Sequence, residues 1–218
     1  MAKLKLIYYM DVLSSWCFAA EEPLARLRER LGGRLDYDWR IAYLFGGGPM
    51  GYGRQLSDWY YGRLKTITGI TLNGSWREAA DDTTWYADLA AQAARELGCT
   101  DDRVRLALTR AAMVDGNHLG KRDVAIAVAA QAAGLSAKEI EHAMDDPATT
   151  EHMRQTTEEF AKLGVAMQPA FVLRSDIADM AVLSGLVRYE TLSSCADEML
   201  DASSKYAEYG GAHPEPAA

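Results

Sequence analysis

The hydrophobic period of this chain changes twice along its length, and this change constrains the fold more than any other feature. Residues 3–10 begin with alternating polar and apolar side chains and end in a continuous apolar run, which is typical of a strand that is buried on both faces. Residues 35–41 alternate apolar and polar side chains, as a half-buried strand does. Between them, leucines recur at helical spacing from Leu24 to Leu31, and two glycines follow. The chain therefore opens with a strand, a helix and a strand.

The middle of the chain has a helical period. From about residue 54 to residue 163, short Ala-rich helices are predicted. Ser136 and Glu139 have the spacing of a capping box, and Asp146 with Pro147 places a cap and a first-turn proline at the next helix. This part of the chain is therefore expected to be all-helical.

Strand periodicity returns after Gly164. Residues 170–173 and 180–183 are short apolar runs separated by turn residues, which predicts a hairpin, and a last helix is predicted to start near Tyr189. The order β-α-β, a helical insertion of roughly a hundred residues, and β-β-α predicts an α/β fold whose sheet is interrupted by a helical lid. A ligand cleft is expected between the sheet and this lid.

The predicted boundaries follow from these changes of period. Residues 1–44 form the first half of the α/β domain, residues 45–163 the helical insertion, and residues 164–209 the second half. Residues 210–218, rich in Gly, Pro and Ala, are predicted to be a disordered tail.

The charge balance excludes several classes of partner. A formal net charge of -8 leaves no large basic surface to neutralise a nucleic acid or an anionic lipid. The chain contains no apolar run of about 18 residues, and the apolar N-terminal stretch is too short for a signal peptide. We therefore expect a cytoplasmic protein that acts on a small molecule, with neither a nucleic acid nor a membrane as partner.

The three cysteines are scattered, and none belongs to a Cys-x-x-Cys pair. No histidine lies near any of them at metal-ligand spacing, so a disulfide scaffold and a metal site are both disfavoured. Cys99 and Cys195 are expected to be buried, reduced thiols. Cys17 belongs to a motif that carries chemistry.

This motif runs from Asp11 to Cys17, between the first buried strand and the start of the first helix. The N-terminus of a helix favours an anion, and a thiolate is such an anion. The pattern Asp-x-x-Ser-x-Trp-Cys resembles the DsbA-type thioredoxin superfamily, whose active-site form is Cys-Pro-Trp-Cys. Ser14 stands where that family has its nucleophilic cysteine.

The far half of the chain carries the same resemblance. The segment 164–172 resembles the family's cis-proline loop, so we expect a cis bond between Gln168 and Pro169, and Ser184–Gly185 resembles the segment that leads into the family's last helix. The resemblance covers the whole chain and implies a thioredoxin-like fold with an inserted helical domain. It also implies a set of residues that contact a bound thiol cofactor: Asp11, Ser15, Trp16, Gln168, Pro169, Ser184 and Gly185.

Serine at the first motif position resembles one branch in particular, the kappa-class glutathione transferases and the 2-hydroxychromene-2-carboxylate isomerases, which carry Ser-Pro-Tyr. In that branch the serine hydroxyl donates a hydrogen bond to the sulfur of a small thiol and helps it to ionise. The resemblance implies that Ser14 activates glutathione or an analogue for isomerase or S-transferase chemistry on an electrophilic substrate. By analogy with that branch, a homodimer is also expected.

Three departures from the branch leave the identity of the thiol open. The glutathione-binding members have Ser-Asp where this chain has Ser184–Gly185, and they have proline where this chain has Ser15. Residues 45–49 also lack the glutathione-binding asparagine that follows the second strand in that branch. The cofactor is therefore predicted to be glutathione or another low-molecular-weight thiol.

Cys17 keeps two alternatives open. It is a second candidate catalytic residue, and if accessible it would make the protein a DsbA-type thiol-disulfide oxidoreductase with a single active thiol. If it is a small core residue, that chemistry is disfavoured, because the Ser14 hydroxyl without an adjacent base cannot replace an attacking thiolate. A non-catalytic member that only binds a ligand is the other alternative. Trp16, Tyr43 and Trp59 are candidate aromatic walls of the cleft, with core packing as the default interpretation.

Overall fold

The first and the last parts of the chain form one sheet together. The structure, a computed structural model, describes residues 2–49, 54–77 and 83–212. Within these ranges the strands form a four-stranded sheet in the order β2-β1-β3-β4. The strands are β1 (Leu4–Met10), β2 (Leu35–Ile41), β3 (Ala170–Ser175) and β4 (Met180–Ser184). β1 pairs in parallel with β2 and antiparallel with β3, and β3 pairs antiparallel with β4, so the predicted α/β order is confirmed.

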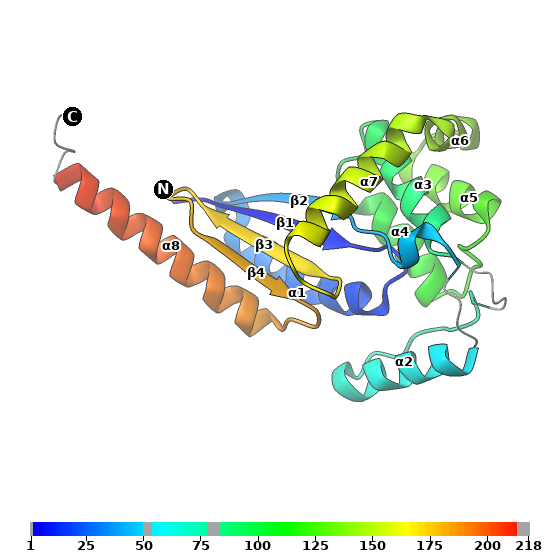
Figure 1. Ribbon diagram of the computed structural model, residues 1–218, viewed down its shortest axis with the longest axis horizontal. Coiled ribbons are helices and arrows are strands. Elements are labelled where there is room, and N and C mark those ends of the chain that lie inside the picture. Colours follow the sequence, from blue (N-terminus) through cyan, green and yellow to red (C-terminus); the bar gives the residue numbers. More distant parts are fainter. Residues whose placement is uncertain (1, 50–53, 78–82, 213–218) are drawn as a thin grey trace.

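Helices cover both faces of this sheet (Figure 1). On one face lie α1 (Ser15–Leu31) and α8 (Tyr189–Ala212), which also contact each other. On the other face α7 (Pro147–Lys162) packs against β2. Alternate residues of β1 enter separate cores: Leu6 and Tyr8 join one, and Ile7 and Tyr9 the other. The continuous apolar run of residues 6–10 therefore reflects a strand buried on both faces.

The insertion is a bundle centred on one alanine-rich helix. This helix, α3 (Trp85–Glu96), contacts four others: α4 (Arg103–Met113), α5 (Arg122–Ala133), α6 (Ala137–Asp145) and α7. Its alanines are buried on all sides, which lets neighbouring helices approach closely. Ser136 and Glu139 form the predicted capping box, and Asp146 caps α7 through Ala148 N–H.

One helix of the insertion stands apart from this bundle. α2 (Arg54–Thr68) lies below the others in Figure 1 and contacts the start of the α/β domain through α1. Two short 3-10 segments, η1 (Gly32–Arg34) and η2 (Phe45–Gly47), complete the elements. Gly47 has a φ of +78° and a Cβ there would lie 2.6 Å from the Trp85 ring, so the glycine lets the η2 loop pack directly on α3.

A buried ionic cluster joins the bundle to the α/β domain. Arg105 of α4 has no exposed surface, and its two Nη atoms donate to the Glu21 carboxylate of α1 at 2.6 and 3.0 Å. Its Nε donates to Asp102 at 2.7 Å, and the Tyr37 hydroxyl of β2 donates to the same carboxylate. Three elements from both parts of the chain are therefore fixed to one guanidinium.

Two boundaries differ from expectation or lie outside the structure. α8 continues through Ala212, whereas a disordered tail was predicted from residue 210, so that prediction is wrong for residues 210–212. The two glycines at 210 and 211 do not end the helix, because α8 continues through them. Residues 213–218 lie outside the described residues. In the described ranges, no helix is long and apolar enough to cross a bilayer.

Candidate functional site

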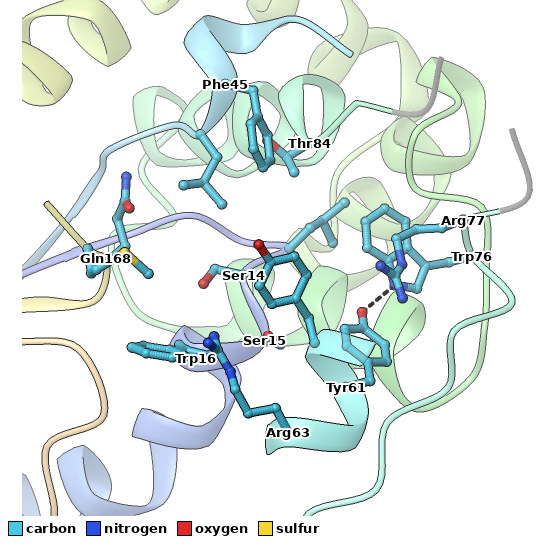
Figure 2. A pocket seen from close by; sticks show the side chains of 14 residues that line it. Ser14, Ser15, Trp16, Phe45, Tyr61, Arg63, Trp76, Arg77, Thr84 and Gln168 are labelled. Carbon is cyan, nitrogen blue, oxygen red and sulfur yellow. Dashed lines mark hydrogen bonds between the residues drawn. The ribbon is translucent and has the colours of Figure 1, made fainter. Parts of the chain in front are cut away.

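A cavity of about 250 Å³ lies where the start of α1 meets the η2 loop, α2 and the loop before β3. Four residues predicted for the site line it: Ser14, Ser15, Trp16 and Gln168. Figure 2 shows Ser14 near its centre, with Trp16 and Gln168 on one side and Arg77, Trp76 and Tyr61 on the other. The predicted cleft between the sheet and the helical insertion is therefore present.

Ser14 is the N-cap residue of α1. Cys17 N–H donates to Ser14 Oγ at 3.4 Å, so the oxygen already accepts one hydrogen bond. A serine hydroxyl is both acceptor and donor, so Ser14 can also donate a hydrogen bond. The first-turn N–H groups of any helix also lack intrahelical acceptors. The floor of the cavity is therefore built to stabilise a negative charge.

The bond between Gln168 and Pro169 is cis, as predicted. Gln168 Nε2 donates to Ala42 O at 2.9 Å, which ties this loop to the end of β2. Ser184 Oγ donates to Met167 O at 2.7 Å, and Gly185 N–H donates to Pro169 O at 2.8 Å. Ser184 and Gly185 were predicted to contact a cofactor; in this structure they hold the cis-proline loop in place.

The Trp16 indole occupies the space beside Gly185. This glycine has a φ of +84°, and a Cβ placed on it would lie 3.3 Å from Trp16 Cζ3. A larger residue here would have to move the indole and adopt a strained backbone. The glycine thus lets Trp16 form a wall of the cavity.

Cys17 lies in the main core, with 1% of its surface exposed. Burial raises the pKa of its thiol to about 12, so the thiol is neutral at physiological pH. A nucleophilic cysteine needs both access and a thiolate. The structure therefore speaks against the catalytic role predicted for Cys17 and favours the core-residue alternative.

We expect Cys17 to resist alkylation in the folded protein. With a pKa near 12, its thiolate fraction at neutral pH is roughly a thousand-fold below that of an ordinary cysteine, and burial slows the reaction further. Cys195, which is only partly buried, serves as the internal reference. Mass spectrometry after timed iodoacetamide treatment should show Cys195 modified well before Cys17, and both modified after denaturation. Early modification of Cys17 would support the alternative that the protein is a thiol-disulfide oxidoreductase acting through Cys17.

Asp11 lies beneath the cavity floor without any exposed surface. Its Oδ1 accepts from Leu13 N–H at 2.8 Å, and its Oδ2 accepts from Leu44 N–H at 2.9 Å and from the Thr84 hydroxyl at 2.8 Å. These bonds join the start of the insertion to the loop before α1. The predicted direct contact between Asp11 and a cofactor is thus replaced by a positioning role, because the carboxylate holds the floor that carries Ser14.

A second buried carboxyl, that of Asp88 in α3, accompanies Asp11. Asp88 Oδ1 accepts from Val12 N–H at 2.8 Å, and its other oxygen has no donor among the described residues. Burial raises the pKa of Asp88 well above its ordinary value, and the neighbouring charge of Asp11 adds to the shift. Burial likewise raises the pKa of Asp11. Asp88 therefore holds a proton more readily than an ordinary aspartate does.

The raised pKa of Asp88 predicts a pH dependence of stability. Between the ordinary carboxyl pKa and the raised value, the folded chain holds a proton that the unfolded chain has released, so stability falls as pH rises through this window. Asp88→Asn keeps an acceptor for Val12 N–H and supplies a donor to Asp11. At about pH 8 we expect the Tm of this variant to exceed that of the wild type, by roughly 2–4 °C for each kcal/mol of stability gained. This difference in Tm should become smaller as the pH is lowered.

Asp115→Asn is the matched control, because Asp115 is exposed in the loop after α4. It should leave the dependence of Tm on pH unchanged. An Asp88→Asn variant that melts below the wild type at every pH would contradict this dependence of stability on the protonation of Asp88.

The opposite wall of the cavity was not predicted. Tyr60, Tyr61 and Arg63 come from α2, and Trp76 and Arg77 come from the loop after it. No motif marks them, although the sequence does cluster aromatic residues around Arg63. They face Ser14 only because α2 folds against α1.

Two of the aromatic residues proposed as walls lie elsewhere. Trp59 is 56% exposed on the outer side of α2. Tyr43 packs edge-on against Trp85, with ring centroids 5.4 Å apart. Trp16 alone of the three lines the cavity.

A family model, the DSBA-like thioredoxin domain, matches residues 5–195. The chain belongs to this family. The resemblance to DsbA-type proteins is therefore confirmed, and with it the thioredoxin-like fold. No curated protein matches the sequence.

Solved structures of this DSBA-like type share the fold at low sequence identity. A protein from Nitrosomonas europaea is 16% identical over 92% of this chain and 98% of that chain, with a TM-score of 0.76. The cytosolic disulfide reductase DsbM from Pseudomonas aeruginosa is 20% identical over 94% and 96%, with a TM-score of 0.67. A 2-hydroxychromene-2-carboxylate isomerase is 16% identical over 94% and 98%, with a TM-score of 0.63. The fold is thus shared by proteins named as a reductase and as an isomerase.

Proposed function

We propose that this DSBA-like protein activates a small thiol at Ser14 and uses it for isomerase or S-transferase chemistry on an electrophilic organic substrate. One observation carries the proposal: the motif's serine lines the cavity at the start of α1, while the motif's cysteine is buried and neutral. The nucleophile must then come from a bound molecule.

Two features of the site favour an ionised thiol. The Ser14 hydroxyl donates a hydrogen bond to the sulfur, and the first turn of α1 adds N–H groups and the positive end of its dipole. The carboxyls of Asp11 and Asp88 beneath the floor disfavour a thiolate, but burial raises their pKa values and so favours their neutral forms, which limits this opposing charge. The hydrogen bond and the helix dipole lower the pKa of the bound thiol relative to its value in water. The neutral forms of the two carboxyls limit how far their charge raises that pKa.

The reaction balances without an external oxidant or reductant. The thiolate adds to a conjugated carbon–carbon double bond, the new C–S bond forms, and the π-electron pair moves to the conjugated carbonyl oxygen. In an isomerase the former double bond rotates, the electron pair returns, and the C–S bond breaks to release the thiolate. In a transferase a proton is added to carbon and the thioether is the product.

The thiol is proposed to be glutathione or another low-molecular-weight thiol. In its favour, one structure of the related DsbM was determined with glutathione. Gly185 stands where the glutathione-binding branch has a carboxylate, and the Trp16 indole lies beside it, so this chain lacks that group for holding glutathione and the thiol can be a different one. Cytoplasmic location, a small-molecule substrate and a homodimer remain part of the proposal.

A thermal-shift titration with glutathione, mycothiol and bacillithiol tests this function. A ligand that binds only the folded chain raises Tm, by roughly 5–10 °C at a hundred times its Kd for a protein of this size. Ophthalmate, the glutathione analogue without sulfur, is the control for peptide binding. We expect one thiol to raise Tm, and the shift to shrink in Ser14→Ala. If none of the three thiols changes Tm, the proposal fails and a non-catalytic ligand-binding protein becomes the better alternative.

A further inference from the structure

The turn that leads into α1 is held by the helical bundle. This turn runs from Asp11 to Ser14, and Ser14 N–H donates to Asp11 O at 3.1 Å. Val12, the second residue of the turn, has no exposed surface. Its N–H donates to Asp88 Oδ1 of α3 at 2.8 Å, and its carbonyl oxygen accepts from the Thr109 hydroxyl of α4 at 2.9 Å. Both polar groups of the Val12 backbone are therefore bonded to the bundle.

These two hydrogen bonds fix the backbone on both sides of Val12. The N–H belongs to the rigid peptide plane before this residue and the carbonyl to the plane after it, so a rotation about either Val12 dihedral moves one plane away from its partner. A buried backbone group that loses its partner costs free energy, which favours the observed turn over its alternatives. Ser14 follows only two residues later, so the orientation of the Val12 backbone sets the position of the Ser14 hydroxyl.

Thr109 can affect the chemistry of the site only through this turn. Leu13 and Ser14 line the cavity, whereas Thr109 is not among the lining residues that the structure describes. A group that stabilises a charge in a site must be held within about 0.5 Å of its productive position, and residues behind the site supply this precision. The Thr109 hydroxyl is placed to do so for Ser14.

The Thr109 hydroxyl has a second acceptor, which limits the size of this effect. It lies 2.9 Å from Arg105 O, the contact that a threonine in a helix makes to the carbonyl four residues before it. One proton therefore serves two acceptors, and the bond to Val12 has at most the strength of a single neutral hydrogen bond. Such a bond contributes about a factor of 3 to 10 to an equilibrium.

We propose that Thr109 is a positioning residue for Ser14: its hydroxyl holds the Val12 carbonyl and thereby places the Ser14 hydroxyl against the bound thiol. The inference rests on the proposed function, in which the Ser14 hydroxyl activates that thiol. It gives the helical insertion a part in the reaction besides forming one side of the cavity.

Thr109→Val removes the hydroxyl and keeps the shape of the side chain. The assay uses 1-chloro-2,4-dinitrobenzene with whichever of glutathione, mycothiol and bacillithiol raises Tm. We expect kcat to fall by about 3- to 10-fold and KM for the electrophile to stay unchanged, because Thr109 lies outside the cavity. The pKa of the bound thiol should rise in the same variant. Thr109→Ser keeps the hydroxyl and should recover most of kcat.

Thr149→Val is the matched control for the loss of a buried threonine hydroxyl. Thr149 is 2% exposed and Thr109 is 3% exposed, and both belong to helices of the bundle. The Thr149 hydroxyl donates to Ala143 O at 2.7 Å, away from the turn before α1. We expect the two valine variants to lose similar amounts of Tm, and only Thr109→Val to lose turnover. Equal turnover in the two variants would overturn the proposal.

A double-mutant cycle shows whether Thr109 acts through Ser14. If it does, adding Thr109→Val to Ser14→Ala should lower kcat by no more than about 2-fold, because the hydroxyl to be positioned is already missing. A residue that only stabilises the fold would lower kcat by the same factor in both backgrounds. Additive losses would therefore contradict the positioning role.

Hydrogen exchange without any thiol tests the hold on the turn by itself. Mass spectrometry of peptides covering residues 11–18 reports on the N–H groups of Val12 and Ser14, which are hydrogen-bonded in this turn. We expect these peptides to exchange about 3- to 10-fold faster in Thr109→Val than in Thr149→Val, because one bond that opposes local opening is lost. Equal exchange in the two variants would overturn the proposal.

These experiments separate this inference from the proposed function. If exchange increases only in Thr109→Val but no thiol raises Tm, Thr109 holds the turn and the thiol chemistry fails. If Ser14→Ala loses turnover while Thr109→Val keeps it, the role of Ser14 stands and the positioning role of Thr109 is overturned.

Discussion

Replacing Ser14 with alanine is expected to lower kcat/KM for thiol conjugation by about 10- to 100-fold, because the bound thiol loses a hydrogen bond to its charged sulfur and ionises less readily. The test uses the thiol that raises Tm and a general electrophile such as 1-chloro-2,4-dinitrobenzene. A second readout is the pKa of the bound thiol, followed by the ultraviolet absorbance of its thiolate. This pKa should rise in the variant, because the hydroxyl no longer donates to sulfur.

The control must account for the second role of Ser14 as an N-cap. Losing that cap costs about 1 kcal/mol, so Ser14→Ala should melt a few degrees below the wild type. Ser136→Ala removes a cap of the same kind from α6, which lies in the bundle and does not reach the cavity. It should lower Tm similarly and leave turnover unchanged. Full turnover in Ser14→Ala would refute the Ser-activated thiol mechanism.

The largest expected loss of stability comes from Arg105→Met. The change leaves the carboxylates of Glu21 and Asp102 without their buried partner, and breaking such a pair costs about 3–5 kcal/mol. For a chain of this size the Tm should fall by roughly 6–20 °C. Thermal unfolding followed by circular dichroism measures it.

Arg154→Met is the matched control, since Arg154 pairs with Glu151 and Glu158 on the exposed face of α7. Exposed ion pairs contribute little, so its Tm should stay close to that of the wild type. An Arg105→Met variant as stable as Arg154→Met would mean that the buried cluster does not fix the insertion to α1.

Local signals in the sequence predicted much of the fold. The change of period located the four strands, and the caps at Ser136 and Asp146 marked true helix starts, because both signals act over a few residues. α8 continues to Ala212, past the end predicted for it, because glycine lowers helix propensity without excluding a helix. The motif also identified Ser14 and the cis bond before Pro169.

The remaining half of the site depends on tertiary contacts that no local pattern encodes. Phe45, Arg63 and Gln168 line one cavity although they are far apart in the chain. Asp88 occupies an ordinary helical position in the sequence, and only the packing of neighbouring helices around α3 makes it a buried acid. Burial decides the chemistry of both Asp88 and Cys17, and burial is a property of the whole fold.

The Arg105 cluster also limits how this protein can change over evolutionary time. The helical bundle cannot be replaced independently of α1, because α1 supplies Glu21 and the bundle supplies Arg105 and Asp102. A single substitution that removes one charge leaves its partner buried without a counter-ion and lowers the stability of the fold. Paired substitutions that remove both charges are expected to be tolerated better. A bundle exchanged from a relative must therefore bring a compatible first helix with it.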